Sequence, residues 1–213
     1  MIPSIDKIQT NSPTPLIQRM FHAREIWLVL QILGVIKPNL NAPDEIALDP
    51  VSMRMTQADL IKQGVLLTNP QGEMRLASEV GALIHSAAYP TTVFIVNIAD
   101  SVRYGKFARL LYFSWTPDAL VVNWVDEASD HHFAAYQPQD IKACVLDYLF
   151  RLGNLEVDDP ATLPANLNRR MMEQIMEETK QTVLLMAVND VQAATQTNHA
   201  LGWFVSPRHA WLL

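Results

Sequence analysis

The spacing of apolar residues changes at Pro90, and this change constrains the fold more than any other feature of the sequence. Before Pro90, apolar residues recur at the 3.6-residue period of helices, whereas later runs rich in Val, Ile, Phe, Tyr and Trp alternate with a period of two. Short turns between such runs favour antiparallel neighbours, because a parallel pair needs a crossover of about a dozen residues or more. The sequence therefore predicts an α+β protein, with an N-terminal winged-helix-like helical part followed by an antiparallel β-sheet packed with helices.

Three amphipathic segments make up the first part of the chain. The spacing of their apolar residues predicts helices over 16–35, 52–63 and 79–88. Between the second and third helices, an Asn-Pro-Gln-Gly turn at 69–72 separates two short extended pieces, which predicts a hairpin. The order helix, helix, hairpin and helix resembles a winged-helix unit.

The second part of the chain is expected to be mostly sheet. Period-two runs predict an antiparallel meander with strands over 93–98, 108–115, 119–125 and 132–137. Further elements are expected in this order: a helix over 139–152, a Met-rich helix over 169–180, and strands over 182–191 and 201–213. The predicted division is a flexible N-terminal arm at 1–15, a winged-helix-like subdomain at 16–90, and a sheet with two helices at 91–213 that shares one core with the subdomain.

Charge and cysteine usage limit the class of protein. The net charge is −6, and neither half is basic: residues 1–90 carry −1 and residues 91–213 carry −5. Nucleic-acid binding is disfavoured, since it needs a concentrated positive surface. The single cysteine, Cys144, excludes an internal disulfide and is expected to be a buried thiol. Without a signal-peptide pattern or an apolar run of about 20 residues, the chain is expected to be soluble and cytoplasmic.

Candidate catalytic and metal-binding groups are few. His131 and His132 lie beside the carboxylates of residues 126–130, but neighbouring residues of a strand point to opposite faces, so both imidazoles cannot easily face one ion. A solvated acidic turn explains this cluster better than a metal site. Cys144 lies in a mostly apolar helical pattern, unlike an activated nucleophile, and no Gly-rich phosphate loop is present. We therefore predict no enzyme activity, no metal and no cofactor.

Two groups of residues are candidates for contact with a protein partner, with core packing as the alternative. They combine flexible methionines with large aromatic rings near the C-terminus: Met171, Met172, Met176, Trp203, Phe204 and Trp211. If the segment Leu201 to Leu213 forms an edge strand, its free backbone groups can pair with a second copy or with a peptide. A homodimer through this C-terminal strand is therefore a hypothesis.

DNA binding is the alternative function. A winged helix would place residues 52–63 in the major groove, with Arg54, Gln57 and Lys62 reading bases. Only two of these side chains are positive, and Asp59 opposes them. A protein-docking role for the same fold needs no additional positive charge.

Three patterns between Glu25 and Leu152 resemble the EspG family, cytosolic proteins of mycobacterial type VII (ESX) secretion. The first is the helix Trp27-Leu28-Val29-Leu30-Gln31-Ile32-Leu33-Gly34. The second is the run Asp59-Leu60-Ile61-Lys62-Gln63-Gly64-Val65-Leu66, followed by a hairpin and by the helix Val80-Gly81-Ala82-Leu83-Ile84, which ends at Tyr89-Pro90. The third is the strand meander that leads into residues 140–152. The resemblance implies an α+β fold built as two similar halves, and a non-enzymatic chaperone that holds secretion substrates through a hydrophobic surface. This chain departs from the family in length. A second half would have to fit into residues 165–213, which leave room for only one helix and a strand pair.

The expected function is therefore a non-enzymatic intracellular protein-binding module. It would act as a chaperone or adaptor, with a secretion-associated role suggested by the resemblance alone. Self-association is the other mode of protein binding that the sequence allows. The alternative is a winged-helix DNA-binding transcription regulator.

Overall fold

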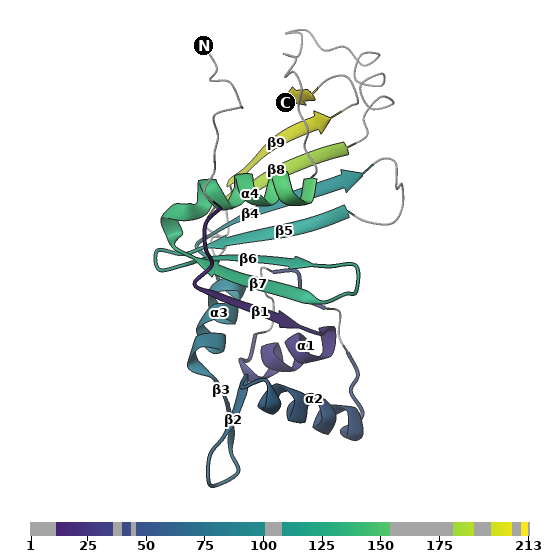
Figure 1. Ribbon diagram of the computed structural model, residues 1–213, viewed down its shortest axis with the longest axis vertical. Helices are drawn as coiled ribbons and strands as arrows, with labels where there is room; N and C mark the ends of the chain where they lie inside the picture. The colour runs from purple at the N-terminus through teal and green to yellow at the C-terminus, as the bar shows by residue number, and fades with distance from the viewer. Residues whose placement is uncertain are drawn as a thin grey trace.

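The computed structural model describes residues 12–35, 40–43, 46–100, 108–153, 181–189, 197–205 and 210–212. Within these ranges, residues 98–100, 108–109, 149–153 and everything after 180 are described by their backbone only. The described elements form a large antiparallel sheet with helices on both faces, and a small hairpin at one end (Figure 1).

The large sheet has eight strands in the order β1-β7-β6-β5-β4-β8-β9-β10, and every neighbouring pair is antiparallel. Their bounds are β1 (Ile17–Phe21), β4 (Thr92–Asp100), β5 (Ala108–Trp115), β6 (Leu120–Val125), β7 (His131–Tyr136), β8 (Gln181–Asn189), β9 (Thr197–Val205) and β10 (Ala210–Leu212). β1 and β10 are therefore the two edges of the sheet.

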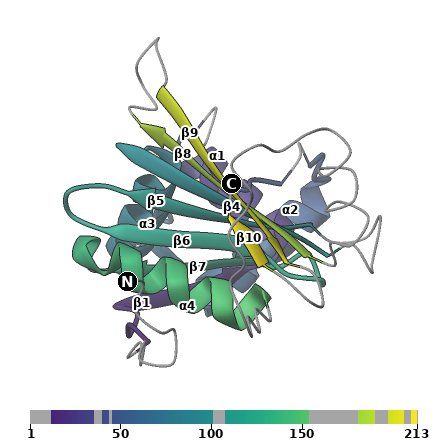
Figure 2. The same cartoon turned by 90° about the horizontal axis from the view of Figure 1, so that it is seen from above.

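The helices lie on both sides of this sheet, and a second sheet of two strands extends from one end. The helices are α1 (Ala23–Ile32), α2 (Pro50–Lys62), α3 (Ser78–Ala88) and α4 (Ile141–Gly153), the last preceded by the 3-10 turn η3 (Pro138–Asp140). The small sheet pairs β2 (Leu66–Thr68) with β3 (Met74–Leu76). Seen from above, α4 crosses one face of the large sheet while α1, α2 and α3 lie behind the other (Figure 2).

Two apolar cores result, one on each face of the sheet. On the first face, α1 and α3 pack against inward side chains of β1, β6 and β7, including Phe21, Val121 and Phe133. The Ser114 hydroxyl donates a 3.0 Å hydrogen bond to the Ala87 carbonyl and ties α3 to β5. Alternation along the strands explains the division, because successive residues of a strand point to opposite faces.

The second core lies under α4 and contains the only cysteine. Cys144 is fully buried there, as the sequence predicted. Tyr148 of the same helix packs edge-on against Phe113 at 5.8 Å, and its hydroxyl lies 3.1 Å from that of Tyr136. These contacts hold α4 across β5 and β7.

The predicted meander is confirmed. β4, β5, β6 and β7 pair in sequence order, each antiparallel to the next, and their bounds differ by at most two residues from the expected ones. The order of helix, helix, hairpin and helix before Pro90 is also present. The winged-helix comparison and the proposed domain division stay predictions; the first core does contain residues from both 16–90 and 91–213.

The prediction of one helix over 16–35 is wrong at its beginning. Residues Ile17–Phe21 form β1 and pair with β7, and the helix begins only at Ala23. The apolar residues of β1 fit both the helical period and the period of two, but burial alternates along the strand: Ile17 is half-buried, Met20 is exposed and Phe21 is fully buried. Pairing with a strand more than a hundred residues later therefore overrides the local helical pattern.

The last predicted strand, 201–213, is also corrected. It consists of the end of β9 and the separate strand β10, which pair with each other. β9 lies between β8 and β10, so only β10 occupies the edge. Three main-chain positions of β10 therefore remain for the hypothetical homodimer contact, which stays a prediction.

Gly64 and Gly81 give an internal test of backbone strain. Gly64, just after α2, has φ +71°, a left-handed conformation that disfavours any side chain. Gly81 is within α3, and the space around the position of an added Cβ is open apart from the helix's own backbone. We expect Gly64→Ala to lower the free energy of unfolding by about 1 kcal/mol and Gly81→Ala to raise it by about 0.5 to 1 kcal/mol. Urea unfolding followed by circular dichroism measures both. Equal signs for the two variants would contradict this assignment.

Candidate functional site at the outer edge of β1

β1 leaves one of its edges open in the described part of the chain. It pairs with β7 on one side, and no described strand pairs with its other side. Leu16, just before this strand, and Met20, within it, are 63% and 51% exposed. A strand edge with exposed apolar side chains is a place where another chain can pair.

A cleft of about 350 Å³ lies beside this strand. Its lining residues come from β1, β6, β7 and α4: Gln18, Arg19, Met20, Trp124, His132, Phe133 and Tyr148. The Trp124 and His132 rings stack at 4.8 Å and 8°, and Tyr148 meets the Trp124 ring edge-on at 5.2 Å. The cleft therefore has an ordered aromatic wall, and the flexible Met20 side chain, which is half exposed, also lines it.

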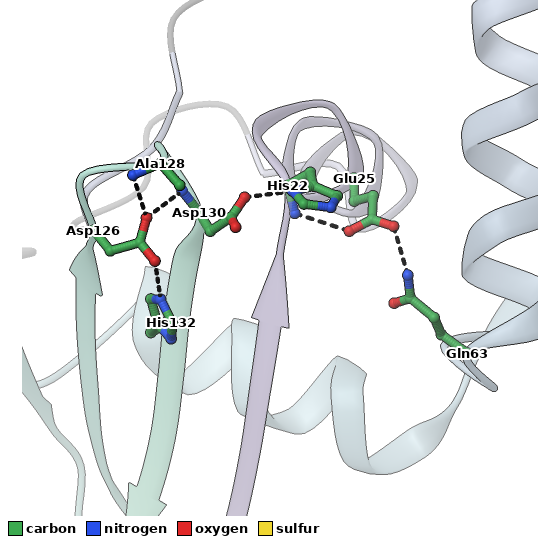
Figure 3. Close-up of polar contacts among 7 residues, drawn as sticks. All are labelled: His22, Glu25, Gln63, Asp126, Ala128, Asp130 and His132. Carbon is green, nitrogen blue, oxygen red and sulfur yellow. Dashed lines mark hydrogen bonds and ion pairs between the residues drawn. The ribbon is translucent and has the colours of Figure 1, made fainter.

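An acidic turn joins β6 to β7 at one end of the cleft. Asp126 accepts hydrogen bonds from the backbone N–H groups of Ala128 and Asp130, and its Oδ2 lies 2.8 Å from His132 Nε2 (Figure 3). The hydrogen bond with His132, supported by those backbone donors, lowers the pKa of Asp126 below its usual value. The turn thus holds a carboxylate at the mouth of the cleft. Stability from this contact is present above pH 3.8 and is lost as the pH falls through the lowered pKa.

A polar chain connects the same turn to α1 and α2 (Figure 3). His22 contacts Asp130 through Nδ1, and its backbone N–H donates a 2.8 Å hydrogen bond to Glu25 Oε2. Glu25, which is only 5% exposed, also accepts a 2.7 Å bond from Gln63 Nε2 through its other oxygen. The junction between β1 and α1 is therefore held in place from two sides.

We expect His22 to make the junction sensitive to pH. Its hydrogen bond with Asp130, followed by the attraction of Asp130, Glu25 and Asp59, raises the pKa of His22 above its usual 6.5. A raised pKa means that the stabilising contact is fully present below pH 6.5 and is lost as the pH rises through the folded-state pKa. In imidazole NMR titrations, Asp130→Asn should lower the His22 midpoint. An unchanged midpoint would contradict the assigned contact.

His131 and His132 lie on opposite faces of β7, as the sequence predicted. His131 is buried, and burial lowers its pKa, whereas His132 stacks on Trp124 in the cleft. Among the residues with described side chains, no three His, Cys, Asp or Glu groups converge as metal ligands.

A second exposed apolar surface belongs to α2 and the hairpin, two elements in contact with each other (Figure 1). Its side chains are 39 to 63% exposed: Val51, Met55, Ile61, Leu67 and Met74. The three side chains proposed to read DNA are on the same helix, where Arg54 and Lys62 are exposed together with Asp59. Apolar and mixed-charge groups therefore share α2.

None of the predicted contact residues has a described side chain. Met171, Met172 and Met176 are outside the described residues. Trp203 and Phe204 are in β9, inside the sheet, and Trp211 is in the edge strand β10. The cleft residues were not identified from the sequence, although the alternating positions of Trp124 and His132 on neighbouring strands were visible there.

Sequence comparisons find no related family, whereas a structural comparison identifies the class of fold. No protein-family model and no curated protein matches this sequence. The chain has the α+β fold of a solved secretion chaperone. That structure is the Mycobacterium tuberculosis type VII secretion chaperone EspG5 in complex with the PE25-PPE41 dimer, with a TM-score of 0.69 over 92% of this chain and 86% of that chain, at 11% identity. The resemblance noted in the sequence is therefore confirmed for the fold. No helix in the described part of the chain is long and apolar enough to cross a membrane.

Proposed function

We propose that this protein is a non-enzymatic protein-binding module that acts as a chaperone or adaptor in a secretion pathway. The observation that carries the proposal is the fold shared with EspG5 over 92% of the chain. Because one fold can serve many functions, the fold match alone does not define a binding site. The surface chemistry of this chain supplies the second argument.

Exposed apolar side chains support a protein partner. Most of the large apolar side chains exposed in the described part lie on the β1 segment, α2 and the hairpin. Exposed apolar groups gathered on neighbouring elements are typical of protein-contact surfaces. The mixed charges of Arg54, Asp59 and Lys62 fit such a surface better than they fit a phosphate backbone.

The test is affinity capture of the tagged protein from the lysate of its own cells, with nuclease added and at two salt concentrations. We expect one stoichiometric protein partner, retained at high salt because burial of apolar surface drives binding. A Val51→Glu, Met55→Glu variant should lose at least about 90% of it, since charged groups are depleted from interface cores. Gln71→Glu, at the exposed hairpin tip, is the control and should retain it.

Two results would contradict the proposal. One is recovery of the protein without any partner. The other is a salt-sensitive complex with duplex DNA that depends on Arg54 and Lys62, which would support the transcription-regulator alternative.

A further inference from the structure

We propose that the outer edge of β1 binds an extended segment of a partner protein by strand addition. A large apolar side chain of that segment occupies the adjacent cleft, and a lysine or arginine two residues away faces the acidic β6–β7 turn. This inference rests on the proposed protein-binding function and identifies a surface for it that is separate from α2 and the hairpin.

The backbone geometry of the sheet favours an added strand. All pairs of the large sheet are antiparallel, and β1 ends the sheet with five residues that pair with a described strand on one side only. A strand added here hydrogen-bonds through its main chain, and its alternate side chains project to the face that carries α4. Gln18 and Met20 of β1 are on that face and line the cleft.

The cleft selects an apolar side chain. Its volume of about 350 Å³ is within the range of small-ligand pockets, and so it has room for a Phe, Leu or Met side chain. The stacked Trp124 and His132 rings form a preformed aromatic wall on which an apolar side chain can pack, and Met20, already 51% exposed, can adapt to the incoming group. Burial of Met20 against such a side chain supplies the driving force.

The charge beside the cleft selects a basic neighbour. The β6–β7 turn carries Asp126, Glu127 and Asp130 and contains no lysine or arginine. Phe21 pairs with His131, so the C-terminal end of β1 lies next to this turn. An antiparallel partner segment begins at that end, which places its lysine or arginine two residues before the apolar side chain.

A second copy of this chain fits the edge poorly. A two-fold antiparallel pairing that uses all five residues of β1 places Arg19, the central residue, opposite Arg19 of the other copy. Like charges directly opposite each other destabilise a strand pair. Glu79 of α3 is the ion-pair partner of Arg19 within each copy, so the homodimer supplies no new partner for either guanidinium group. A segment with a different sequence is therefore the better occupant.

The experiment uses the full chain and a fluorescein-labelled nonapeptide rich in alternating threonines, with one phenylalanine and one lysine two residues before it. We expect saturable binding by fluorescence anisotropy. Glutamate in place of the peptide's lysine, or alanine in place of its phenylalanine, should weaken binding by about tenfold each. Two further peptides carry N-methyl groups on alternate amides, one on the odd-numbered and one on the even-numbered residues. One of them should lose binding and the other should keep it, because only one of the two sets of N–H groups faces β1.

Two exposed apolar side chains on different elements provide the matched variants. Met20→Glu should weaken binding of the peptide by at least about tenfold, since it places a charge at the cleft. Ile32→Glu, at a side chain 41% exposed at the end of α1 and outside both proposed surfaces, should leave it unchanged within about twofold. Both variants should keep the wild-type circular dichroism spectrum and melting temperature.

Absence of peptide binding, equal loss in the Met20→Glu and Ile32→Glu variants, or equal binding of both N-methylated peptides would overturn the strand-addition inference. A captured protein partner that binds the Met20→Glu variant normally would also overturn it and would leave the proposed function intact. Failure to capture any partner, combined with specific peptide binding at β1, would instead contradict the chaperone proposal and support this surface.

Discussion

Replacement of Phe21 by alanine is expected to lower the free energy of unfolding by about 3 to 5 kcal/mol. The Phe21 ring is fully buried in the first core and meets the Phe133 ring edge-on at 5.8 Å. The variant loses both the transfer of this ring from water and the aromatic contact, and it leaves a cavity between β1, β7 and α1. Urea unfolding monitored by tryptophan fluorescence measures the difference.

The preceding residue supplies the control for this variant. Met20 points to the other face of β1 and is 51% exposed, so Met20→Ala should change the free energy of unfolding by no more than about 0.5 kcal/mol. Similar losses at both positions would contradict the strand assignment, because a strand places only one of two neighbouring side chains in the first core.

Replacement of Glu25 by alanine is expected to lower the free energy of unfolding by about 1.5 to 3 kcal/mol. Its buried carboxylate accepts hydrogen bonds from the His22 backbone N–H and from Gln63 Nε2. Alanine leaves the N–H group at the beginning of α1 without this acceptor and disconnects α1 from the end of α2. Chemical unfolding of the purified variant measures the loss.

Two further variants test the source of the effect. Glu25→Gln retains one oxygen acceptor and should lose less stability than Glu25→Ala. In a double-mutant cycle, Gln63→Ala should have little additional effect once Glu25 is alanine, because the shared hydrogen bond is already absent. Fully additive losses would show that the contact with Gln63 contributes nothing to stability.

The meander could be predicted from the sequence because its strands need only local information. Each strand is rich in Val, Ile, Phe, Tyr, Trp or Ala, and the connections between them contain Gly105, Pro117-Asp118 or the acidic residues 126–130. Short turns fix sequential antiparallel pairing, and the structure has that pairing. The helix after η3 was also predictable, since Pro138 favours the first turn of a helix.

β1 could not be predicted because its conformation depends on a distant partner. Ile17, Met20 and Phe21 fit the helical spacing of the residues that follow, and no turn separates them from α1. What makes them a strand is β7, whose Phe133 and Ala135 pack on the same face. Information of this kind is absent from a local pattern.

The cleft was missed for a related reason. The sequence shows Trp124 and His132 on neighbouring strands, but their stacking depends on the β6–β7 register, which sets them directly opposite each other. Tyr148 comes from α4, and its position over Trp124 depends on how that helix crosses the sheet. A cleft built from four elements is therefore visible only after folding.

The pairing of β1 with β7 also delays completion of the first core while the chain is being synthesised. β1 leaves the ribosome first, yet its partner follows more than a hundred residues later, since Ile17 pairs with Ala135. At elongation rates of about 5 to 20 residues per second this wait is roughly 6 to 24 seconds, during which Phe21 has no β7 to pack against. The nascent chain thus passes through a long interval in which β1, α1 and α3 have been synthesised but cannot complete their core with β6 and β7.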